Sequence, residues 1–300
     1  MHISQKTLVK NLSFEGIGLH SGKPVKIILK PDEINSGISY IFNKTKIKAS
    51  WKNAIVSQLC TKIKNKNVYI STIEHLMSAL SAVGITNLII ETNSSEMPIL
   101  DGSSKDFFDE INNIGILKQK ENQKILKIKK KVTYKLNDKF IKIEPIENNS
   151  LIIDYTIDYK DDFIKKQNFF YEHSFENYKQ IYKARTFCLH KDLEMIFSMG
   201  LAKGGSLDNA IVVSGNKILN QGGLRYPNEF VRHKVLDCIG DLYLAGYQLS
   251  GKVTTCAGGH EVNLMLLNEI FKDNSNYELI DNLNISSFKQ DNEKLKIASI

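Results

Sequence analysis

A single predicted helix carries three side chains that could bind a metal ion or hold a proton in place. Apolar residues recur at helical spacing from residue 230 to residue 246, which predicts a helix with one buried face. His233, Asp237 and Asp241 follow one another at intervals of four, so they lie along one line of that helix. An imidazole and a carboxylate one turn apart can both bind one divalent cation. A solvated, ion-paired helix face explains the same short pattern, so a metal site requires another ligand from elsewhere.

A second histidine, preceded by a glutamate, lies in the other half of the chain. The sequence predicts a helix that begins at Ser71 or Thr72, which can cap it, and ends at Gly84. His75 lies in this helix beside Glu74. Glu74 also stands at the spacing of a capping box with Ser71, so a structural role explains this carboxylate as well as a chemical one does.

If His75, His233 and Asp237 converge, they form the mixed nitrogen and carboxylate ligand set of a catalytic zinc site with an open position. A structural zinc site would instead be closed by cysteines, and no two of the four cysteines have the required spacing. Hydrolysis at such a site needs a base that takes a proton from water, and Glu74 is covalently next to one of the three candidate ligands.

A candidate general acid lies near the end of the chain. His260 follows two glycines in the segment 258–261, which we interpret as a flexible turn that leads into a strand at 261–267. Asp241 could hold this imidazole and raise its pKa, so that the imidazole is protonated at neutral pH. A plain hairpin explains the two glycines equally well, and spacing along the chain does not show that these residues converge.

The composition indicates a soluble globular enzyme or binding protein. The chain has 300 residues, 42% hydrophobic and 24% charged, with a net charge of +7. A basic surface favours anionic partners such as phosphates. The cysteines form no disulfide framework, the N-terminus has no apolar signal segment, and no apolar run is long enough to cross a bilayer. We therefore expect a cytoplasmic protein with reduced thiols and no membrane span.

The elements that must position these side chains predict an α+β fold. A change in composition near residues 119–131 suggests two domains, residues 1–122 and 123–300. In the first we expect strands at 5–12, 25–30, 38–47 and 87–92 and helices at 71–84 and 105–114. In the second we expect strands at 125–136, 140–144 and 151–159, a strand or loop at 169–175, helices at 177–184, 194–200 and 230–246, a hairpin of 209–214 with 217–219, and the strand at 261–267.

Seven motifs occur in an order that resembles one known family. The motifs are residues 16–22 (GIGLHSG), 71–76 (STIEHL), 96–103 (EMPILDGS), 184–187 (ARTF), 204–211 (GGSLDNAI), 224–241 (LRYPNEFVRHKVLDCIGD) and 259–260 (GH). With them the chain resembles the UDP-3-O-acyl-N-acetylglucosamine deacetylases, zinc amidases that catalyse the committed step of lipid A biosynthesis. The resemblance extends from residue 1 to about residue 270.

The resemblance implies two domains of similar two-layer α+β topology, packed against each other with the active site in the cleft between them. It implies that His75, His233 and Asp237 bind one Zn²⁺ per chain, although Fe²⁺ could occupy the same ligands in cells. Glu74 becomes the base toward the attacking water, and His260 becomes the acid that protonates the departing amine.

The resemblance also assigns supporting roles. Thr186 would stabilise the oxyanion, and Lys234 and Asp241 would support the site, with Asp241 orienting His260. The residues expected to contact the substrate are Lys142, Phe187 and Asp192. An insert near residues 196–213 would line an apolar passage for the acyl chain, with Phe197, Met199, Leu201 and Leu207.

The substrate implied by the resemblance is UDP-3-O-acyl-N-acetylglucosamine, an amphiphilic diphosphate that suits a basic protein with an apolar slot. We expect a monomer without a nucleic-acid partner, in at most peripheral contact with a membrane. One alternative is a zinc hydrolase that acts on another amide or ester. A basic nucleic-acid-binding module is a second alternative, but the lysines are scattered and no interleaved aromatic platform is evident.

Overall fold

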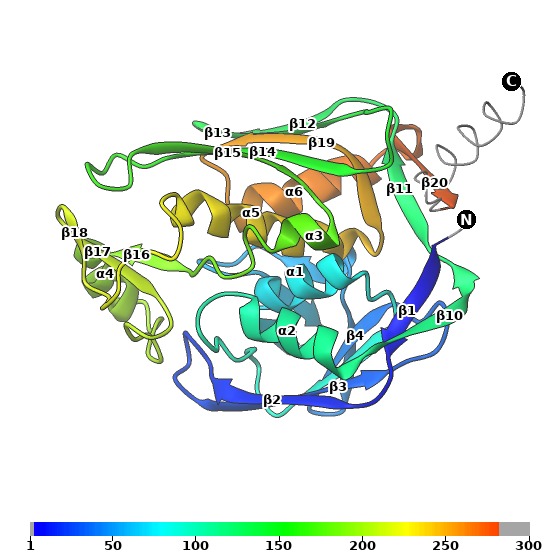
Figure 1. Cartoon of the computed structure of the whole chain (residues 1–300), viewed down its shortest axis with the longest axis horizontal. Helices are drawn as coiled ribbons and strands as arrows, with labels where there is room; N and C mark the ends of the chain where they lie inside the picture. The colour runs from blue at the N-terminus through cyan, green and yellow to red at the C-terminus, as the bar shows by residue number, and fades with distance from the viewer. Residues whose placement is uncertain (1–2, 282–300) are drawn as a thin grey trace, which may run out of the picture.

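The protein consists of two α+β halves that pack against each other through their helices. The structure is a computed structural model and describes residues 3–281. Figure 1 shows four layers, in which a sheet at each outer face encloses two layers of helices. This arrangement confirms the predicted α+β fold of two packed units with similar topology.

The sheet of the first half has the strand order β2-β3-β9-β4-β5. Its central strand, β9, runs antiparallel to β3 and parallel to β4. Helices α1 (Glu74–Val83) and α2 (Lys105–Ile114) lie in the inner layer. The strands are β2 (Leu12–Ile17), β3 (Pro24–Pro31), β4 (Ile38–Phe42), β5 (Thr45–Lys48) and β9 (Leu88–Thr92).

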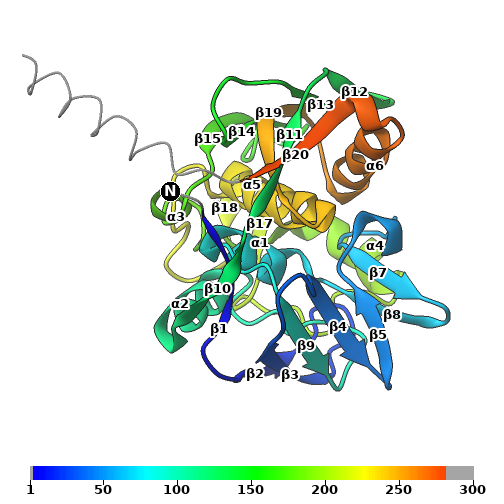
Figure 2. The ribbon, with the colours of Figure 1, turned by 90° about the vertical axis from the view of Figure 1, so that its right-hand side faces the viewer.

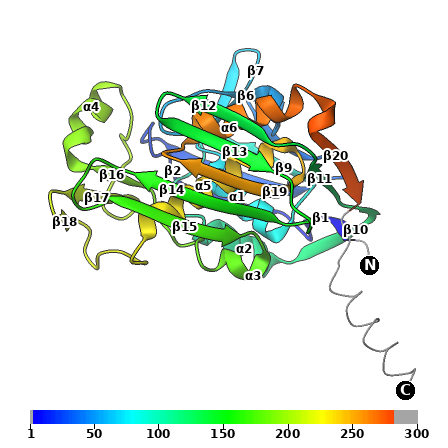
Figure 3. The same ribbon diagram turned by 90° about the horizontal axis from the view of Figure 1, so that it is seen from above.

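The sheet of the second half repeats this order with β12-β13-β19-β14-β15. Its central strand, β19, is again antiparallel to one neighbour, β13, and parallel to the other, β14. Helices α5 (Glu229–Leu242) and α6 (His260–Phe271) lie beneath the sheet, as the view from above shows (Figure 3). The strands are β12 (Val132–Leu136), β13 (Lys139–Glu144), β14 (Leu151–Asp158), β15 (Lys166–Glu172) and β19 (Gln248–Cys256).

The repeat extends to a further pair of strands in each half. In the first half β1 (Ser4–Leu8) pairs antiparallel with β10 (Ile116–Asn122), which follows α2. In the second, β11 (Lys124–Ile128) pairs antiparallel with β20 (Tyr277–Asp281), which follows α6. β11 also extends β19 in parallel. We propose the domain boundary at residues 122/123, between β10 and β11.

Each half carries an insert at the same point of the repeat. The first insert lies between β5 and α1, and the second lies between β15 and α5. The first insert contains β6 (Ala54–Ile55), β7 (Lys62–Asn65) and β8 (Val68–Ser71), which form a small sheet at one side of the molecule (Figure 2). The second contains α3 (Phe175–Tyr178), β16 (Phe187–Leu189), α4 (Leu193–Ser198), β17 (Ile211–Ser214) and β18 (Lys217–Ile218). β17 and β18 form the predicted hairpin.

The two halves meet where α1 packs against α5. All residues of α1 are buried, so this helix lies between the two halves and has no solvent-exposed face. Gly240 of α5 permits the close approach, because a Cβ atom there would lie 2.0 Å from the carbonyl oxygen of Glu74. The first turn of α1 therefore lies directly against the polar line of α5.

Two elements differ from the prediction in the region after α5. Residues 261–267, predicted as a strand, form most of α6, and the central strand β19 was not predicted at all. The apolar character of this segment suggested a strand, but burial of Val262, Leu266 and Ile270 at helical spacing decides the outcome. β19 contains Gly251 and several polar residues, so the alternation of apolar and polar residues that is typical of a strand is not evident in its sequence.

Smaller corrections concern turns and caps. The predicted strand 38–47 is the β4–β5 hairpin, the predicted strand 125–136 is β11 followed by β12, and helix 177–184 shortens to α3. Neither Ser71 nor Thr72 caps α1: Ile73 holds the N-cap position without a side-chain hydrogen bond, and the expected capping box does not form. Gly84 ends α1 as predicted, with a φ of 79°.

Within residues 3–281, all four cysteines are free thiols and none of the helices is long and apolar enough to cross a membrane. The chain after Leu267 completes α6 and adds β20, and its remainder, from residue 282, lies outside the described residues.

Candidate metal centre and active site

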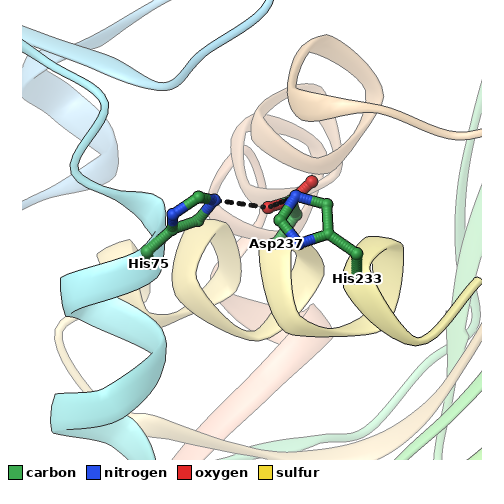
Figure 4. A group of neighbouring side chains, drawn as sticks. All are labelled: His75, His233 and Asp237. Atoms are coloured by element: carbon green, nitrogen blue, oxygen red, sulfur yellow. Dashed lines mark ion pairs between the residues drawn. The ribbon is translucent and has the colours of Figure 1, made fainter. Parts of the chain in front are cut away.

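Three buried side chains from both halves of the molecule converge at the α1–α5 contact. Figure 4 shows His75 on α1 pointing toward Asp237 and His233 on α5. Asp237 Oδ1 lies 3.5 Å from His75 Nε2 and 3.4 Å from His233 Nε2. One donor atom from each residue lies within 4.8 Å of the others, which is a spacing that a single cation can bridge. The structure therefore brings together the three predicted metal ligands.

The surroundings of these residues fit a metal ion better than an ion-paired cluster. Asp237 Oδ1 is buried and has no hydrogen-bond partner among the described residues, whereas Lys234 Nζ donates to Asp237 Oδ2 over 2.9 Å. A buried, unpaired carboxylate oxygen is costly unless a cation satisfies it. Burial would raise the pKa of Asp237, but the surrounding groups, Lys234 among them, outweigh burial and hold that pKa well below its usual value.

The tautomer of His233 also suits a metal ligand. His233 Nδ1 lies 3.0 Å from the Ala184 carbonyl oxygen, which can only accept, so Nδ1 carries the proton and Nε2 is free to bind a cation. Burial lowers the pKa of His233 to about 3, because the imidazolium form is poorly solvated there. The ring is therefore neutral at neutral pH, as coordination requires.

A buried ion pair holds the segment that carries this carbonyl group. Glu229, at the start of α5, accepts from the backbone N–H of Arg185 over 3.0 Å and from its Nε over 2.9 Å. Both side chains are almost fully buried. The pair fixes the segment 184–187 against α5, which places Ala184 beside His233 and Thr186 at the edge of the site. The motif of residues 184–187 thus has a positional explanation.

Glu74 lies at the first turn of α1, next to the three candidate ligands and to His260. Its Oε2 accepts from the Thr61 backbone N–H over 3.0 Å, and its Oε1 lies 3.9 Å from His260 Nε2. Burial raises the pKa of Glu74 to about 7, an effect that His260 and His75 partly offset. A carboxylate with this pKa can accept and release a proton near neutral pH.

His260 is the first residue of α6, and not part of a flexible turn. Its Nδ1 lies 2.9 Å from Asp241 Oδ2, which also accepts from Asn263 Nδ2 over 2.8 Å. Burial by itself would lower the pKa of His260, but Asp241 and then Glu74 raise it to about 9. The imidazole is therefore protonated at neutral pH, and its Nε2 faces Glu74 and Asp237.

A cavity of about 870 Å³ opens onto these residues. Thr186, Phe187 and Lys234 line it with the site residues, and the Phe187 ring packs edge-on against Phe230, with centroids 4.9 Å apart. The outer wall is apolar and comes from both inserts. Its apolar lining residues are Val56, Leu59, Leu193, Met195, Ile196, Phe197, Met199, Leu207, Val212 and Leu219.

Two predicted substrate contacts lie elsewhere. Lys142, in β13, forms an ion pair with Glu144 (Nζ to Oε2, 2.6 Å), and its strand neighbours Ile141 and Ile143 are the ones buried in the core. Asp192 precedes α4 as its N-cap residue. Neither residue is among those that line the cavity in the described part of the chain, whereas Lys139, earlier in β13, does line it. As substrate contacts, both stay predictions.

Sequence reasoning missed several residues of this site. Thr61 contacts Glu74, Asp241 and His260, and Asn263 contacts Asp241. Spacing carried no signal for Thr61, because its partners come from three other segments of the chain. Asn263 could have been found only if α6 had been recognised as a helix, since it lies three residues after His260.

His20, whose role the sequence left open, also lines the cavity. The Ala202 backbone N–H lies 3.4 Å from its Nδ1, and its Nε2 is buried without a partner among the described residues. Its backbone N–H donates to Glu96 Oε1 over 2.7 Å, so the buried Glu96 carboxylate fixes the glycine-rich loop of residues 16–22. The loop thereby forms part of the wall.

The arrangement combines a candidate cation site with two groups suited to proton transfer. Glu74 is ionised above a pKa of about 7, as a general base must be, and His260 is protonated below a pKa of about 9, as a general acid must be. Both groups lie beside the three ligands and face one cavity. Metal-assisted hydrolysis of an amide or ester requires these groups when the leaving group must receive a proton.

Comparison with known proteins points to one family. The family model described as UDP-3-O-acyl N-acetylglycosamine deacetylase matches residues 5–272. A protein of Campylobacter jejuni subsp. doylei is 44% identical over 283 residues, which are 93% of this chain and 95% of that protein. A protein of Campylobacter lari is 43% identical over 292 residues (96% and 98%), and one of Campylobacter fetus subsp. fetus is 41% identical over 281 residues (93% and 95%). All three are named UDP-3-O-acyl-N-acetylglucosamine deacetylase.

Proposed function

The chain belongs to the UDP-3-O-acyl N-acetylglycosamine deacetylase family, and from this premise we propose that it hydrolyses the N-acetyl amide of UDP-3-O-acyl-N-acetylglucosamine. The products are UDP-3-O-acyl-glucosamine and acetate, and the reaction is the committed step of lipid A biosynthesis. The observation that supports the proposal most is the unpaired, buried Asp237 Oδ1 between two imidazoles, beside Glu74 and His260.

The proposed cofactor is one Zn²⁺ ion per chain, held by His75, His233 and Asp237. Two neutral imidazoles and one carboxylate suit zinc, and Fe²⁺ could use the same ligands. When bound, such an ion lowers the pKa of water and polarises the amide carbonyl group. Lys234 supports the set from the protein side, because its ammonium group occupies Asp237 Oδ2 and leaves Oδ1 for the cation.

Glu74 is the proposed general base. Its ionised carboxylate removes a proton from the water molecule whose oxygen forms the new bond to the acetyl carbon. The Thr61 N–H holds Oε2, so Oε1 is the atom free to accept this proton. Because burial raises the pKa of Glu74 to about 7, the carboxylate is a stronger base than an exposed glutamate would be, and about half of it is ionised at neutral pH.

His260 is the proposed general acid. Its Nδ1–H is held by Asp241, so the proton at Nε2 is the one directed toward the cavity. As the C–N bond breaks, Nε2 gives this proton to the departing sugar nitrogen, which leaves as an amine instead of an unstable anion. Thr186 is the proposed donor to the oxyanion, because its side chain lines the cavity beside the ligands.

The cavity supports the proposed substrate class. Its apolar outer wall can accommodate an acyl chain, and several of its members are still well exposed, including Met195 (57%) and Phe197 (54%). Phe187 lies where it can contact the sugar, and Lys142 and Asp192 are proposed contacts of the nucleotide sugar that the cavity lining does not include. We further propose a cytoplasmic monomer that contacts membranes at most peripherally and binds no nucleic acid.

One purified sample can test the activity and the metal together. Metal content and acetate release from UDP-3-O-acyl-N-acetylglucosamine should be measured before chelation, after chelation, and after addition of Zn²⁺ or Fe²⁺. We expect about one ion per chain, loss of activity with the ion, and recovery on its return. Hydrolysis of simple N-acetyl sugars at the same rate as of the acylated UDP-sugar would contradict the proposed substrate, and full activity without metal would contradict the proposed chemistry.

A further inference from the structure

Thr61 contacts both proton-transfer groups of the site and yet cannot be one of them. It is fully buried, immediately before β7 in the first insert, and its hydroxyl group is not acidic or basic enough to exchange protons near neutral pH. Its partners lie on α1, α5 and α6. Its backbone N–H and its hydroxyl group can therefore act only by orienting these partners.

The backbone N–H of Thr61 selects which oxygen of Glu74 is available. It donates to Glu74 Oε2 over 3.0 Å, so that oxygen is occupied. The other oxygen, Oε1, lies 3.9 Å from His260 Nε2. A carboxylate held at one oxygen cannot rotate freely, which keeps the second oxygen directed toward the proton that it must accept.

The side chain of Thr61 determines the geometry of the other group. Its hydroxyl donates to Asp241 Oδ1, and its oxygen lies 3.1 Å from His260 Nδ1. The single hydroxyl proton is directed to Asp241, so the hydroxyl oxygen can only accept from His260. Asp241 Oδ2, 2.9 Å from the same nitrogen, is also an acceptor. Two acceptors at Nδ1 require the proton to be there, which leaves Nε2 as the nitrogen that exchanges a proton with the cavity.

We propose that Thr61 is a positioning residue: through its hydrogen bonds it fixes the orientation of the general base and of the general acid relative to each other across the interface between the two halves. The inference rests on the proposed function, because it presupposes the roles of Glu74 and His260. Thr61 belongs to the first half, whereas Asp241, 180 residues away, belongs to the second. The first insert thereby sets the orientation of a pair of groups to which each half contributes one member.

The decisive variant is Thr61→Val, which keeps the size of the side chain and the backbone N–H to Glu74 but removes the hydroxyl. Loss of such a supporting hydrogen bond typically costs 10- to 100-fold in activity. We expect kcat to fall by about 10- to 100-fold with KM changed by less than about threefold, and with metal content unchanged. Thr61→Ser restores the hydroxyl and should recover most of kcat. Unchanged kcat in Thr61→Val, or no recovery in Thr61→Ser, would overturn the proposal.

A matched control separates this effect from the loss of any buried hydroxyl group. Thr7 is also buried, in β1, and its Oγ1 accepts from the Asp32 N–H over 3.1 Å. Neither Thr7 nor Asp32 is among the residues that line the cavity. Thr7→Val should leave kcat within about twofold. If Thr61→Val does not fold, Thr61→Ala provides the same loss of the hydroxyl without a branched side chain, and the same comparison with Thr61→Ser applies.

A double-mutant cycle tests whether Thr61 acts through Asp241. In an Asp241→Ala background the hydroxyl has lost its acceptor, so adding Thr61→Val should lower kcat by less than about threefold further. Full additivity of the two losses would show that Thr61 has no specific connection to Asp241 and would contradict the proposal.

A readout independent of turnover distinguishes failure of this inference from failure of the proposed function. The imidazole ¹⁵N and ¹H resonances of His260 report which nitrogen carries the proton. They should show a protonated Nδ1 in the wild type and in Thr61→Ser, and a perturbed Nδ1 signal in Thr61→Val. If the wild type does not act on the UDP-sugar, the proposed function fails while this measurement still tests the contacts. Identical His260 spectra in wild type and Thr61→Val would overturn the positioning role.

Discussion

The two halves of this protein have the same order of strands and helices but contribute unequally to the site. α1 of the first half supplies Glu74 and His75, both in its first turn. The equivalent helix of the second half, α5, supplies His233, Asp237 and Asp241 over three turns. A repeated scaffold therefore brings two equivalent helices together, and the chemistry depends on which side chains each one presents at the contact.

The second pair of equivalent helices shows the contrast more clearly. At the start of α2, the Lys105 N–H donates to Ser103 Oγ, an ordinary way to satisfy a free helix N–H. At the start of α6, Gly259 provides no capping side chain, and His260 faces the cavity. The same position of the repeat thus stabilises a helix end in one half and holds a proton donor in the other.

The strongest test of shared ligation compares one histidine from each half. His75→Ala and His233→Ala should each lose most of the bound metal, because two remaining ligands bind a cation weakly. Turnover should fall by more than about 10⁴-fold, since the chemistry of the ion is lost as well as its binding. Metal analysis with activity assays measures both. If one variant keeps stoichiometric metal, that histidine is not a ligand.

The second largest effect is expected at the proposed base, Glu74, which belongs to the first half. Glu74→Gln should keep the metal but lower kcat by about 10²- to 10⁴-fold, because an amide cannot accept the proton from water. Glu15→Gln, at an exposed carboxylate of β2, is the control and should be active. Near-normal activity of Glu74→Gln would show that Glu74 is not the general base.

The pH profile should separate the contributions of the two halves. Glu74 must be ionised, so activity should fall about tenfold per pH unit below its pKa of about 7. His260 must be protonated, so activity should fall in the same way above its pKa of about 9. Asp241→Asn should shift the upper limit downward, because that carboxylate is the largest contribution that raises the pKa of His260. The lower limit should also move downward, because the same carboxylate raises the pKa of Glu74. An upper limit that does not move would exclude His260 as its source.

The smallest expected effect lies at the contact between the halves. Gly240→Ala places a methyl group 2.0 Å from the Glu74 carbonyl oxygen, so α1 and α5 must move apart. Overpacking of this kind costs about 1–3 kcal/mol, which should lower the thermal midpoint by about 2–4 °C per kcal/mol. Asn112→Ala, at an exposed position of α2, should not lower it. Thermal unfolding followed by circular dichroism measures both variants.

Much of the local structure could be predicted because its signals are short-range. Helix α2 has the predicted bounds, and Gly84 ends α1, since amphipathic periodicity and a glycine at the C-terminus act within a few residues. Residues 261–267 show where this fails. Their short apolar run fits a strand as well as a helix, but packing against the core and the contact of Asn263 with Asp241 make them a helix.

The candidate site divides in the same way. Spacing alone placed His233 and Asp237 on one line of a helix and Glu74 beside His75, because residues four apart or adjacent have fixed geometry in a helix. Spacing also placed Asp241 on this line. The hydrogen bond between Asp241 and His260, however, depends on how α5 and α6 pack.

Residue types and spacing therefore identified the side chains that could bind a cation or transfer a proton, and their order along each helix. Only the tertiary structure decided that one oxygen of Asp237 lies between imidazoles from two halves, and that Thr61 reaches both Glu74 and Asp241. The physical reason is that such distances are set by the close approach of α1 and α5 at Gly240 and by the inserts around it. Local spacing carries no information about contacts between segments that lie more than a hundred residues apart.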